Sequence, residues 1–475
     1  MQPEKKANIF LGSSEDEVQN YVKRHNPYTK EVVSYAASCS EGDAKKALHI
    51  AKSAIKRAKA TTLNQRMQWL EDVAKQLEAN KEDIAKTIVD EVAKPLTFAR
   101  IEVDRCIETI RLSIHAATNL HGKTIPTDVM PSGKKTLAYY FKEPVGVVAC
   151  ITPFNFPLNL VAHKLAPALV AGNAVVLKPT PEAPLTAYKF AKLFIQSPYA
   201  VKDALSVVYG DAEVGSALVQ SSIPRVISFT GSVPVGKIIT SQAGIKKVSL
   251  ELGGNAATYI HESADINHAA KRCAFGAFVN SGQVCISLQR IYVDDSIYEE
   301  FGNCLAKYSA DLKVGSPYEE DTFMGPLIDE DANKRAMGWV EEAIAEGATL
   351  LCGGSVTDGV FAPTVVSDVD DSMQVVCEEV FAPIVSLVRV KGYNEAVKKV
   401  NASPYGLQFS IFTNDLHYTK KAIDEFEAGG IVVNDIPTLR FDVQPYGGIK
   451  NSGIGREGPE FALEEFTEIK SVVIN

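Results

Sequence analysis

The sequence predicts an α/β protein with two domains, each built on a mostly parallel sheet. Its length of 475 residues exceeds the usual size of a single domain. Short β-type runs alternate with helical patterns in the first half of the chain, at residues 145–151, 174–177, 205–208 and 226–229. Such alternation is typical of a parallel sheet with crossover helices. A second alternating series, from residue 256 to residue 433, predicts the second domain.

The chain before the first of these strands is expected to be helical. Ser40 and Asp43 form a helix start signal, and apolar residues follow it at helical spacing: Ala47, Ile50, Ala51, Ala54, Ile55 and Ala58. More helix is expected as far as residue 120. Two strand candidates lie outside both series, within residues 123–141 and at 467–474. Exposed edge strands usually pair with another strand, which either completes their own sheet or belongs to a second chain.

The composition excludes several classes of protein. Asp and Glu outnumber Lys and Arg by 58 to 49, which argues against a nucleic-acid surface. No apolar run approaches the roughly 20 residues of a membrane span, and the first residues lack the apolar core of a signal peptide. The 8 cysteines are scattered, so neither a metal site nor a disulfide framework is expected. We therefore expect a soluble cytoplasmic protein with reduced thiols that contacts neither nucleic acid nor membrane.

Two segments carry residues suited to nucleophilic and acid–base chemistry. Cys285 ends the segment FVNSGQVC, in which a Gly-Gln turn can present the sulfur to a cleft. The commoner fate of a lone cysteine is a buried structural thiol. Glu251 lies between two leucines at a strand end, before paired glycines. Burial there would raise its pKa towards the range of a general base, whereas a glutamate at the edge would simply reach solvent.

Two further segments could bind an oxyanion and a phosphate. Asn155 follows the 145–151 strand between two prolines, which stiffen the turn and could aim its amide at an oxyanion. Gly231 and Ser232 lie between a strand and a helix start, an arrangement that offers free N–H groups to a phosphate. Lys178, at the end of another strand, could add a cation for the same ligand. Taken singly, asparagine and glycine at such positions are more often plain turn residues.

Together and in this order, these segments resemble the aldehyde dehydrogenase superfamily. The resemblance runs from about residue 20 to the C-terminus and rests on PFNFP (153–157), KP (178–179), FTGS (229–232), LELGG (250–254), GQVC (282–285), EEVFAP (378–383) and PYGGIK (445–450). It implies an enzyme that oxidises a small aldehyde to its carboxylic acid with NAD or NADP. Cys285 would be the nucleophile and Glu251 the general base. Asn155, with the backbone N–H of Cys285, would stabilise the oxyanion.

The resemblance also implies cofactor residues and a domain plan. Lys178 would bind the adenosine ribose, Gly231 and Ser232 the pyrophosphate, and Glu379 the nicotinamide ribose, while Phe381, Thr152 and Pro153 would lie beside the cofactor. The implied aldehyde dehydrogenase fold has a Rossmann-like cofactor domain at residues 1–121 and 142–251 and an α/β catalytic domain at 252–452. A β oligomerisation extension at 122–141 and 453–475 would join subunits into a homodimer or homotetramer, which would employ both unassigned strand candidates.

Other functions are weighed against this one. A catalytically silent structural member of the fold is disfavoured because every catalytic position of the motifs is filled. Relatives that pass the acyl group to coenzyme A generally lack the carboxylate at the position of Glu251. A cysteine protease or a thiolase would need a histidine partner, and His163 alone lies near any motif.

The choice of cofactor and the substrate remain open. NAD-preferring members often carry a glutamate three residues after the lysine of the Lys-Pro pair; here Pro181 stands there, with Glu182 next, so NADP is not excluded. Phe154 replaces a tryptophan frequent in broad-range relatives. Arg440 lies in a loop similar to those of relatives acting on hydroxylated or anionic aldehydes, and Arg105 could join it; a solvated loop arginine is the alternative. Lactaldehyde is the first expected substrate, ahead of succinate semialdehyde, glyceraldehyde 3-phosphate and phosphono- or sulfo-aldehydes.

Overall fold

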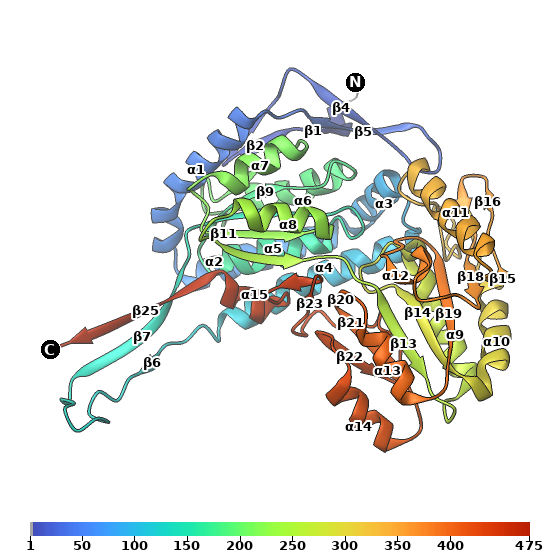
Figure 1. Ribbon diagram of the computed structural model, residues 1–475. Coiled ribbons are helices and arrows are strands. Elements are labelled where there is room, and N and C mark those ends of the chain that lie inside the picture. The colour runs from blue at the N-terminus through green and yellow to red at the C-terminus, as the bar shows by residue number, and fades with distance from the viewer. Residues whose placement is uncertain (1–2) are drawn as a thin grey trace.

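The computed structural model describes residues 3–475 and contains two large sheets covered by helices (Figure 1). The first sheet has eight strands in the order β24-β12-β11-β8-β9-β10-β2-β3, and its five central members are parallel. The bounds of all eight strands, in sheet order, are Gly453–Ile454, Lys247–Glu251, Val226–Thr230, Val147–Ile151, Ala174–Lys178, Leu205–Val207, Ile9–Leu11 and Ser14–Asp16. The four strands predicted in this half are therefore confirmed. β8 begins after Gly146, whose φ of 120° ends the extended run before it.

Helices cover both faces of this sheet. One face packs against α1 (Glu41–Ala60), α7 (Ala212–Gln220) and α8 (Val233–Gln242), and the other packs against α5 (Asn159–Val170) and α6 (Pro184–Gln196). The side chains of neighbouring residues in β8 pack on opposite faces. Val147 packs in the core on the side of α1, and Val148 packs in the core on the side of α5. Four helices pack beyond α5 and α6: α2 (Leu63–Ala79), α3 (Lys81–Val92), α4 (Leu96–Ala117) and α15 (Pro459–Glu465). The predicted start of α1 is confirmed, because Ser40 and Asp43 form a reciprocal capping box.

The second sheet has seven strands in the order β15-β18-β19-β14-β13-β21-β22, and all but β15 are parallel. Their bounds, in sheet order, are Thr349–Cys352, Thr364–Ser367, Ile384–Val390, Leu288–Asp294, Ala256–Ile260, Gln408–Phe412 and Gly430–Val433. One face packs against α9 (Ile266–Phe278) and α10 (Tyr298–Ala310). The other packs against α11 (Glu330–Ala345), α12 (Gln374–Cys377), α13 (Tyr393–Asn401) and α14 (Leu416–Glu425). The second alternating series is thus confirmed as an α/β unit.

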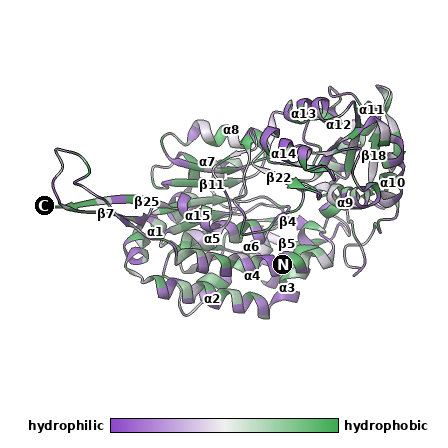
Figure 2. Ribbon diagram, turned by 90° about the horizontal axis from the view of Figure 1, so that it is seen from below, coloured by the Kyte–Doolittle hydropathy of each residue, from purple (hydrophilic) through white to green (hydrophobic). Residues whose placement is uncertain are grey.

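A long two-stranded ribbon projects from the body of the molecule (Figures 1 and 2). β25 (Thr467–Ile474) pairs antiparallel with β7 (Leu137–Pro144) along its whole length, and β6 (Lys123–Thr124) adds a short third strand. The two strand candidates therefore pair with each other. The rest of the segment 453–475 lies elsewhere, since β24 pairs with β12 and α15 packs on α4 and α5. No helix in residues 3–475 is long and apolar enough to cross a bilayer.

Short elements complete the described chain. The N-terminal segment forms a small sheet in the order β1-β5-β4, with bounds Lys6–Ala7, Val32–Ala37 and Tyr21–His25. The remaining strands form two-stranded pairs: β16 (Val356–Thr357) with β17 (Val360–Phe361), and β20 (Tyr405–Gly406) with β23 (Ile449–Lys450). Three single turns of 3₁₀-helix are η1 (Pro3–Lys5), η2 (Val279–Gly282) and η3 (Asp295–Ile297). Of these, η2 leads to the candidate site.

Candidate active site

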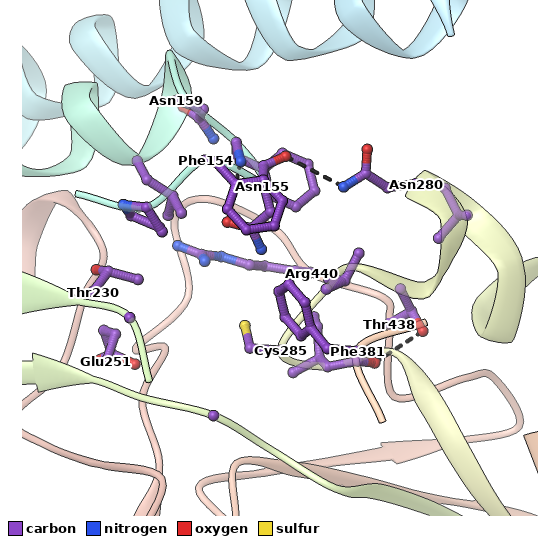
Figure 3. A pocket seen from close by; sticks show the side chains of 18 of the residues that line it. Phe154, Asn155, Asn159, Thr230, Glu251, Asn280, Cys285, Phe381, Thr438 and Arg440 are labelled. Carbon is purple, nitrogen blue, oxygen red and sulfur yellow. Dashed lines mark hydrogen bonds between the residues drawn. The ribbon is translucent and has the colours of Figure 1, made fainter. Parts of the chain in front are cut away.

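A cavity of about 720 Å³ lies where the carboxyl end of the first sheet meets the second α/β unit. Parallel strands place their carboxyl ends at one edge, and in this register Thr230 pairs with Glu251 and Ile151 with Lys178. Most of the predicted site residues line this cavity: Arg105, Pro153, Phe154, Asn155, Gly231, Ser232, Glu251, Cys285, Glu379, Phe381 and Arg440. Thr152 and Lys178 lie just outside it, joined by a backbone hydrogen bond of 3.2 Å. Figure 3 shows the side chains of Glu251, Cys285 and Arg440 around a common space.

The turn that carries Asn155 is held by a buried ion pair. The ammonium of Lys94 donates to the Asn155 carbonyl at 2.8 Å and is paired with the Glu102 carboxylate. Glu102 in turn accepts the backbone N–H groups of Leu158 and Asn159, at 2.9 and 3.2 Å. Lys94 and Glu102 are 3% and 1% exposed, so the pair cannot reorient towards solvent. Sequence reasoning missed both residues, although a glutamate on the apolar face of α4 was a signal.

The Asn155 side chain points from this turn to the segment that precedes Cys285. Its amide nitrogen donates to the carbonyl of Gln283 at 3.0 Å. An asparagine amide carries two N–H donors, so the second is not needed for this contact. The side chain is 7% exposed and lines the cavity. The interpretation of Asn155 as an amide aimed from a stiff turn therefore agrees with its placement.

Cys285 follows a tightly bent segment, η2 and the turn after it. Asn280 and Ser281 both adopt left-handed conformations, with φ of 54° and 56°, which non-glycine residues adopt rarely. Such strain persists only where surrounding contacts impose it, and here the Asn280 amide donates to the Asn155 carbonyl at 3.3 Å (Figure 3). Gly282 has φ of 70°, and a Cβ there would lie 2.2 Å from the Ala382 carbonyl oxygen. This bend presents Cys285 to the cavity instead of the core.

Within residues 3–475, one polar group lies in hydrogen-bond contact with the sulfur of Cys285. The hydroxyl of Tyr446 lies 2.9 Å from Sγ, and either atom can be the donor while the thiol is neutral. Burial raises the pKa of the thiol, whereas the Tyr446 hydrogen bond and the charge of Arg440 lower it. Tyr446 is the third residue that sequence reasoning missed, because nothing in the PYGGIK motif indicates which residue its hydroxyl contacts.

Glu251 is buried at the end of β12 and is 4% exposed. Neither of its carboxylate oxygens has a hydrogen-bond partner within the described residues. Burial raises the pKa of Glu251 well above its ordinary value, and the nearby Glu457 carboxylate raises it further. The solvent-reaching alternative for this glutamate is therefore wrong. The glycines that follow allow close approach, since a Cβ on Gly254 would lie 2.2 Å from the Cys285 carbonyl oxygen.

In the lining of the cavity and just outside it, the residues present fit a dinucleotide. Thr230 and Thr152 have buried hydroxyls without a partner in residues 3–475. Ser232 is the N-cap of α8 and makes no side-chain cap hydrogen bond, which leaves N–H groups of the first turn available. Lys178 is 7% exposed, and burial lowers its pKa against the opposing charges of Glu182 and Asp211. These groups match the polar and anionic parts of a nucleotide.

Glu379 and Phe381 border the same space closer to Cys285. Glu379 accepts the backbone N–H of Gly254 at 2.9 Å, and burial raises its pKa to about 7. The ring of Phe381 meets that of Phe154 edge-on, with centroids 6.0 Å apart. Both aromatic rings and the Glu379 carboxylate line the cavity next to the thiol.

The lining of the cavity also includes a cluster of buried charges. Arg440 donates to Glu457 at 2.7 Å, and its guanidinium lies 3.8 Å from the centroid of the Tyr446 ring. Arg105 forms a two-pronged pair with Asp442, at 2.9 and 2.7 Å. The side chain of Arg440 is only 10% exposed and that of Arg105 is 27% exposed. The alternative of a solvated loop arginine is therefore wrong for Arg440, whose charge is already paired.

The fold and this site define a class: an enzyme of two α/β units with a thiol, a buried carboxylate and a nucleotide-sized cavity between them. Residues 13–472 match the model of the aldehyde dehydrogenase family. A 3-sulfolactaldehyde dehydrogenase from Priestia aryabhattai is 42% identical over 451 residues, which cover 95% of this chain and 94% of that protein. The chain belongs to the aldehyde dehydrogenase family, and it is an NAD(P)-dependent oxidoreductase acting on an aldehyde.

Two solved structures share the complete architecture. Aldehyde dehydrogenase 21 from Physcomitrella patens, in complex with its reaction product succinate, superposes with a TM-score of 0.96 at 37% identity, covering 100% of this chain and 99% of that one. An NADP-dependent glyceraldehyde-3-phosphate dehydrogenase from Bacillus halodurans, complexed with NADP, gives a TM-score of 0.96 at 34% identity, with 99% of both chains covered. The predicted fold, family and cofactor class are thereby confirmed.

Proposed function

We propose that the chain oxidises a short aldehyde through a thioester on Cys285. The observation that carries this proposal is the presence of the Cys285 thiol, the Asn155 amide and the Glu251 carboxylate in the lining of one cavity. The thiolate of Cys285 adds to the carbonyl carbon, and the Asn155 amide with the Cys285 backbone N–H donates to the resulting oxyanion. A bound NAD(P)⁺ supplies the hydride acceptor that this oxidation requires.

The remaining thioester must be hydrolysed, and Glu251 is suited to that step. A carboxylate with a raised pKa is a stronger base than an exposed one, so it can take a proton from the attacking water near neutral pH. Its two oxygens make no other hydrogen bond within residues 3–475, so both remain available to a water molecule. Turnover of a panel of short aldehydes with each cofactor tests the proposal as a whole, and inactivity with every member would contradict it.

For the cofactor we propose a position along the carboxyl edge of the first sheet. Lys178 would bind the adenosine ribose, Gly231 and Ser232 the pyrophosphate, and Thr152 and Pro153 would line the path to the nicotinamide. Glu379 would bind the nicotinamide ribose, with Phe381 beside the ring. The proposal draws support from the buried threonine hydroxyls and the uncapped start of α8, both of which require polar partners.

We expect the enzyme to use both NAD and NADP, and Glu182 is the residue expected to disfavour NADP. We expect measurable activity with both NAD and NADP, because selectivity often depends on a repulsive group and Pro181 supplies none. The negative charge of Glu182 is close enough to favour the ammonium form of Lys178, so its carboxylate should repel a 2′-phosphate bound there. Glu182→Gln is expected to raise kcat/KM for NADP relative to NAD about tenfold, on the order of 1.4 kcal/mol.

The ratio of kcat/KM values for the two cofactors, measured with one aldehyde, checks this expectation. The matched control is Glu300→Gln, which removes an exposed carboxylate from α10. A wild-type preference beyond about a thousandfold, roughly 4 kcal/mol, that Glu182→Gln leaves unchanged would show that another residue excludes one cofactor.

For the substrate we propose an aldehyde of two to four carbons with a hydroxyl or an anionic group, and lactaldehyde is the first to test. Arg105, Arg440 and Phe154 would line its binding site. The name of the Priestia relative specifies a substrate with a hydroxyl and a sulfonate, and the Physcomitrella patens enzyme was solved with succinate, a dicarboxylate product. Arginine binds carboxylate, phosphate and sulfonate through parallel hydrogen bonds. Succinate semialdehyde, glyceraldehyde 3-phosphate and phosphono- or sulfo-aldehydes form the rest of the panel.

Arg105 provides the sharper test of this proposal. Removing Arg440 would leave the buried Glu457 with Lys164, at 3.7 Å, as its nearest lysine or arginine, and would disturb the site for every substrate. Asp442, the buried partner of Arg105, keeps its hydrogen bond with His163 at 3.0 Å, and Arg105 is the more exposed arginine. Losing a hydrogen bond to a charged group costs about 1.5–3 kcal/mol. Arg105→Gln should therefore lower kcat/KM for succinate semialdehyde about ten- to a hundredfold and leave propanal almost unchanged. Arg111→Gln, on the exposed side of α4, is the control; equal losses for both aldehydes would show that Arg105 only supports the pocket.

Assembly, compartment and domain division complete the proposal. We propose that β7 and β25 join subunits into a homodimer or homotetramer, since their ribbon projects from the body of the molecule and exposes Leu137, Ile469 and Val473. The molar mass in solution, compared with that of a chain lacking residues 467–475, tests this.

The division into a cofactor domain, a catalytic domain and an oligomerisation extension is retained, with 453–466 assigned to the cofactor domain. A reducing cytoplasm suits a nucleophile that must stay a free thiol.

A further inference from the structure

Tyr446 is fixed in place on the wall of the cavity next to the thiol. Its backbone N–H and carbonyl pair with the carbonyl and N–H of Glu457, at 2.9 and 2.6 Å. The residue is 5% exposed, and its ring has the Arg440 guanidinium over one face. Because both the backbone and the ring are held, the hydroxyl has little freedom to leave the Cys285 sulfur, which lies 2.9 Å away.

We propose that Tyr446 is the positioning residue of the nucleophile: when the Cys285 thiol loses its proton to solvent water, the Tyr446 hydroxyl donates a hydrogen bond to the thiolate and keeps it aimed into the cavity. The inference rests on the proposed role of Cys285. Among residues 3–475, the Tyr446 hydroxyl is the only group in hydrogen-bond contact with this sulfur. Catalytic thiols are more often activated by a histidine or lysine side chain next to the sulfur. Here the phenol of Tyr446 occupies that position.

The direction of the hydrogen bond follows from the two groups themselves. Burial, together with the charge of Cys285, raises the pKa of Tyr446 well above its ordinary value, so the phenol keeps its proton. A thiolate can only accept, and the tyrosine then donates. The hydrogen bond lowers the pKa of the thiol, as the nearby positive charge of Arg440 also does.

Other charges face the sulfur as well. Glu379 and Glu251 raise the pKa of Cys285, and burial raises it more than either. The Tyr446 hydrogen bond is the largest influence in the opposite direction, ahead of Arg440. Removing this one hydroxyl should therefore change the ionisation of the thiol more than removing any other single group that favours the thiolate.

Tyr446→Phe removes the hydroxyl and keeps the ring. A hydrogen bond to a charged group of ordinary strength predicts a rise of about one to two pH units in the midpoint of Cys285 ionisation. Because a thiolate of higher pKa is intrinsically more nucleophilic, alkylation of Cys285 by iodoacetamide near pH 8 should fall only about three- to tenfold. Aldehyde oxidation should fall by a similar factor at neutral pH and recover as the pH rises.

The midpoint is read from thiolate absorbance, with Cys285→Ala as the blank, and alkylation is assigned to Cys285 by mass spectrometry of its peptide. Tyr259→Phe is the matched control, because it removes a buried hydroxyl that bonds Asp294 at 2.8 Å in the second α/β unit. Nucleotide binding by both variants checks their folding.

Three outcomes are separable. A raised midpoint with turnover that recovers at high pH supports the inference, because a tyrosine that merely fills space would not move a pH profile. An unshifted midpoint overturns it. A raised midpoint with unchanged turnover at every pH supports the contact but contradicts the proposed nucleophile, so failure of the inference and failure of the proposed function remain distinguishable.

Discussion

Cys285→Ala is expected to abolish aldehyde oxidation while nucleotide binding persists. No other cysteine lies in the lining of the cavity, so no second thiol can replace it. Without the thioester the carbon has no covalent route to the acid, and loss of a catalytic nucleophile typically costs on the order of 10⁵–10⁶-fold in kcat. The measurement is reduced-nicotinamide formation with lactaldehyde, alongside a calorimetric titration of NADP into each protein.

The control for this variant is Cys377→Ala, which removes a half-buried thiol from the end of α12, outside the cavity. It should oxidise aldehydes at the wild-type rate. Near-normal turnover by Cys285→Ala would contradict the covalent mechanism, because the remaining groups of the site offer no nucleophile. Loss of both turnover and nucleotide binding would instead report a folding defect, which the far-ultraviolet spectrum of the variant would reveal.

The periodic parts of the fold could be predicted from the sequence because local pattern and tertiary structure agree there. The capping box at Ser40 and Asp43, the buried strands and the C-terminal strand at 467–474 all lie where the pattern indicates. The segment between residues 453 and 466 could not be placed in this way. β24 pairs with β12 and α15 packs on α4, partners hundreds of residues away in the chain, and no local periodicity specifies such pairings.

The residues of the candidate site fall into the same two groups: those that a local sequence pattern indicates and those that only tertiary contacts reveal. Cys285, Glu251 and Asn155 follow strands or glycine turns, and their sequence contexts are distinctive enough to single them out. Lys94, Glu102 and Tyr446 act through contacts with residues far away in sequence, such as the 161 positions that separate Tyr446 from Cys285. The pairing of Arg440 with Glu457, 17 positions along the chain, has no sequence signal either, and it places a charge predicted to face the substrate in an ion pair.

Glu251→Gln is expected to separate the two half-reactions. Acylation does not need the base, so mixing the variant with aldehyde and cofactor should still release about one equivalent of reduced nicotinamide per site in a burst. Hydrolysis does need it, and loss of a general base usually costs about 10²–10⁴-fold. The steady-state rate should fall by that factor, and the acyl group should remain on Cys285, where mass spectrometry of the quenched protein detects it.

The pH dependence of the steady-state rate, which thioester hydrolysis should limit, tests whether Glu251 is the base. Burial holds the pKa of Glu251 above its ordinary value, so at low pH the carboxyl is protonated and cannot accept a proton from water. In the wild type, hydrolysis should therefore speed up as the pH rises through this raised pKa, and glutamine at position 251 should remove that acid limb. Glu300→Gln, remote from the cavity, should keep both the limb and the rate. A variant with no burst and an unchanged steady rate would show that Glu251 is not the base and that another group activates the water.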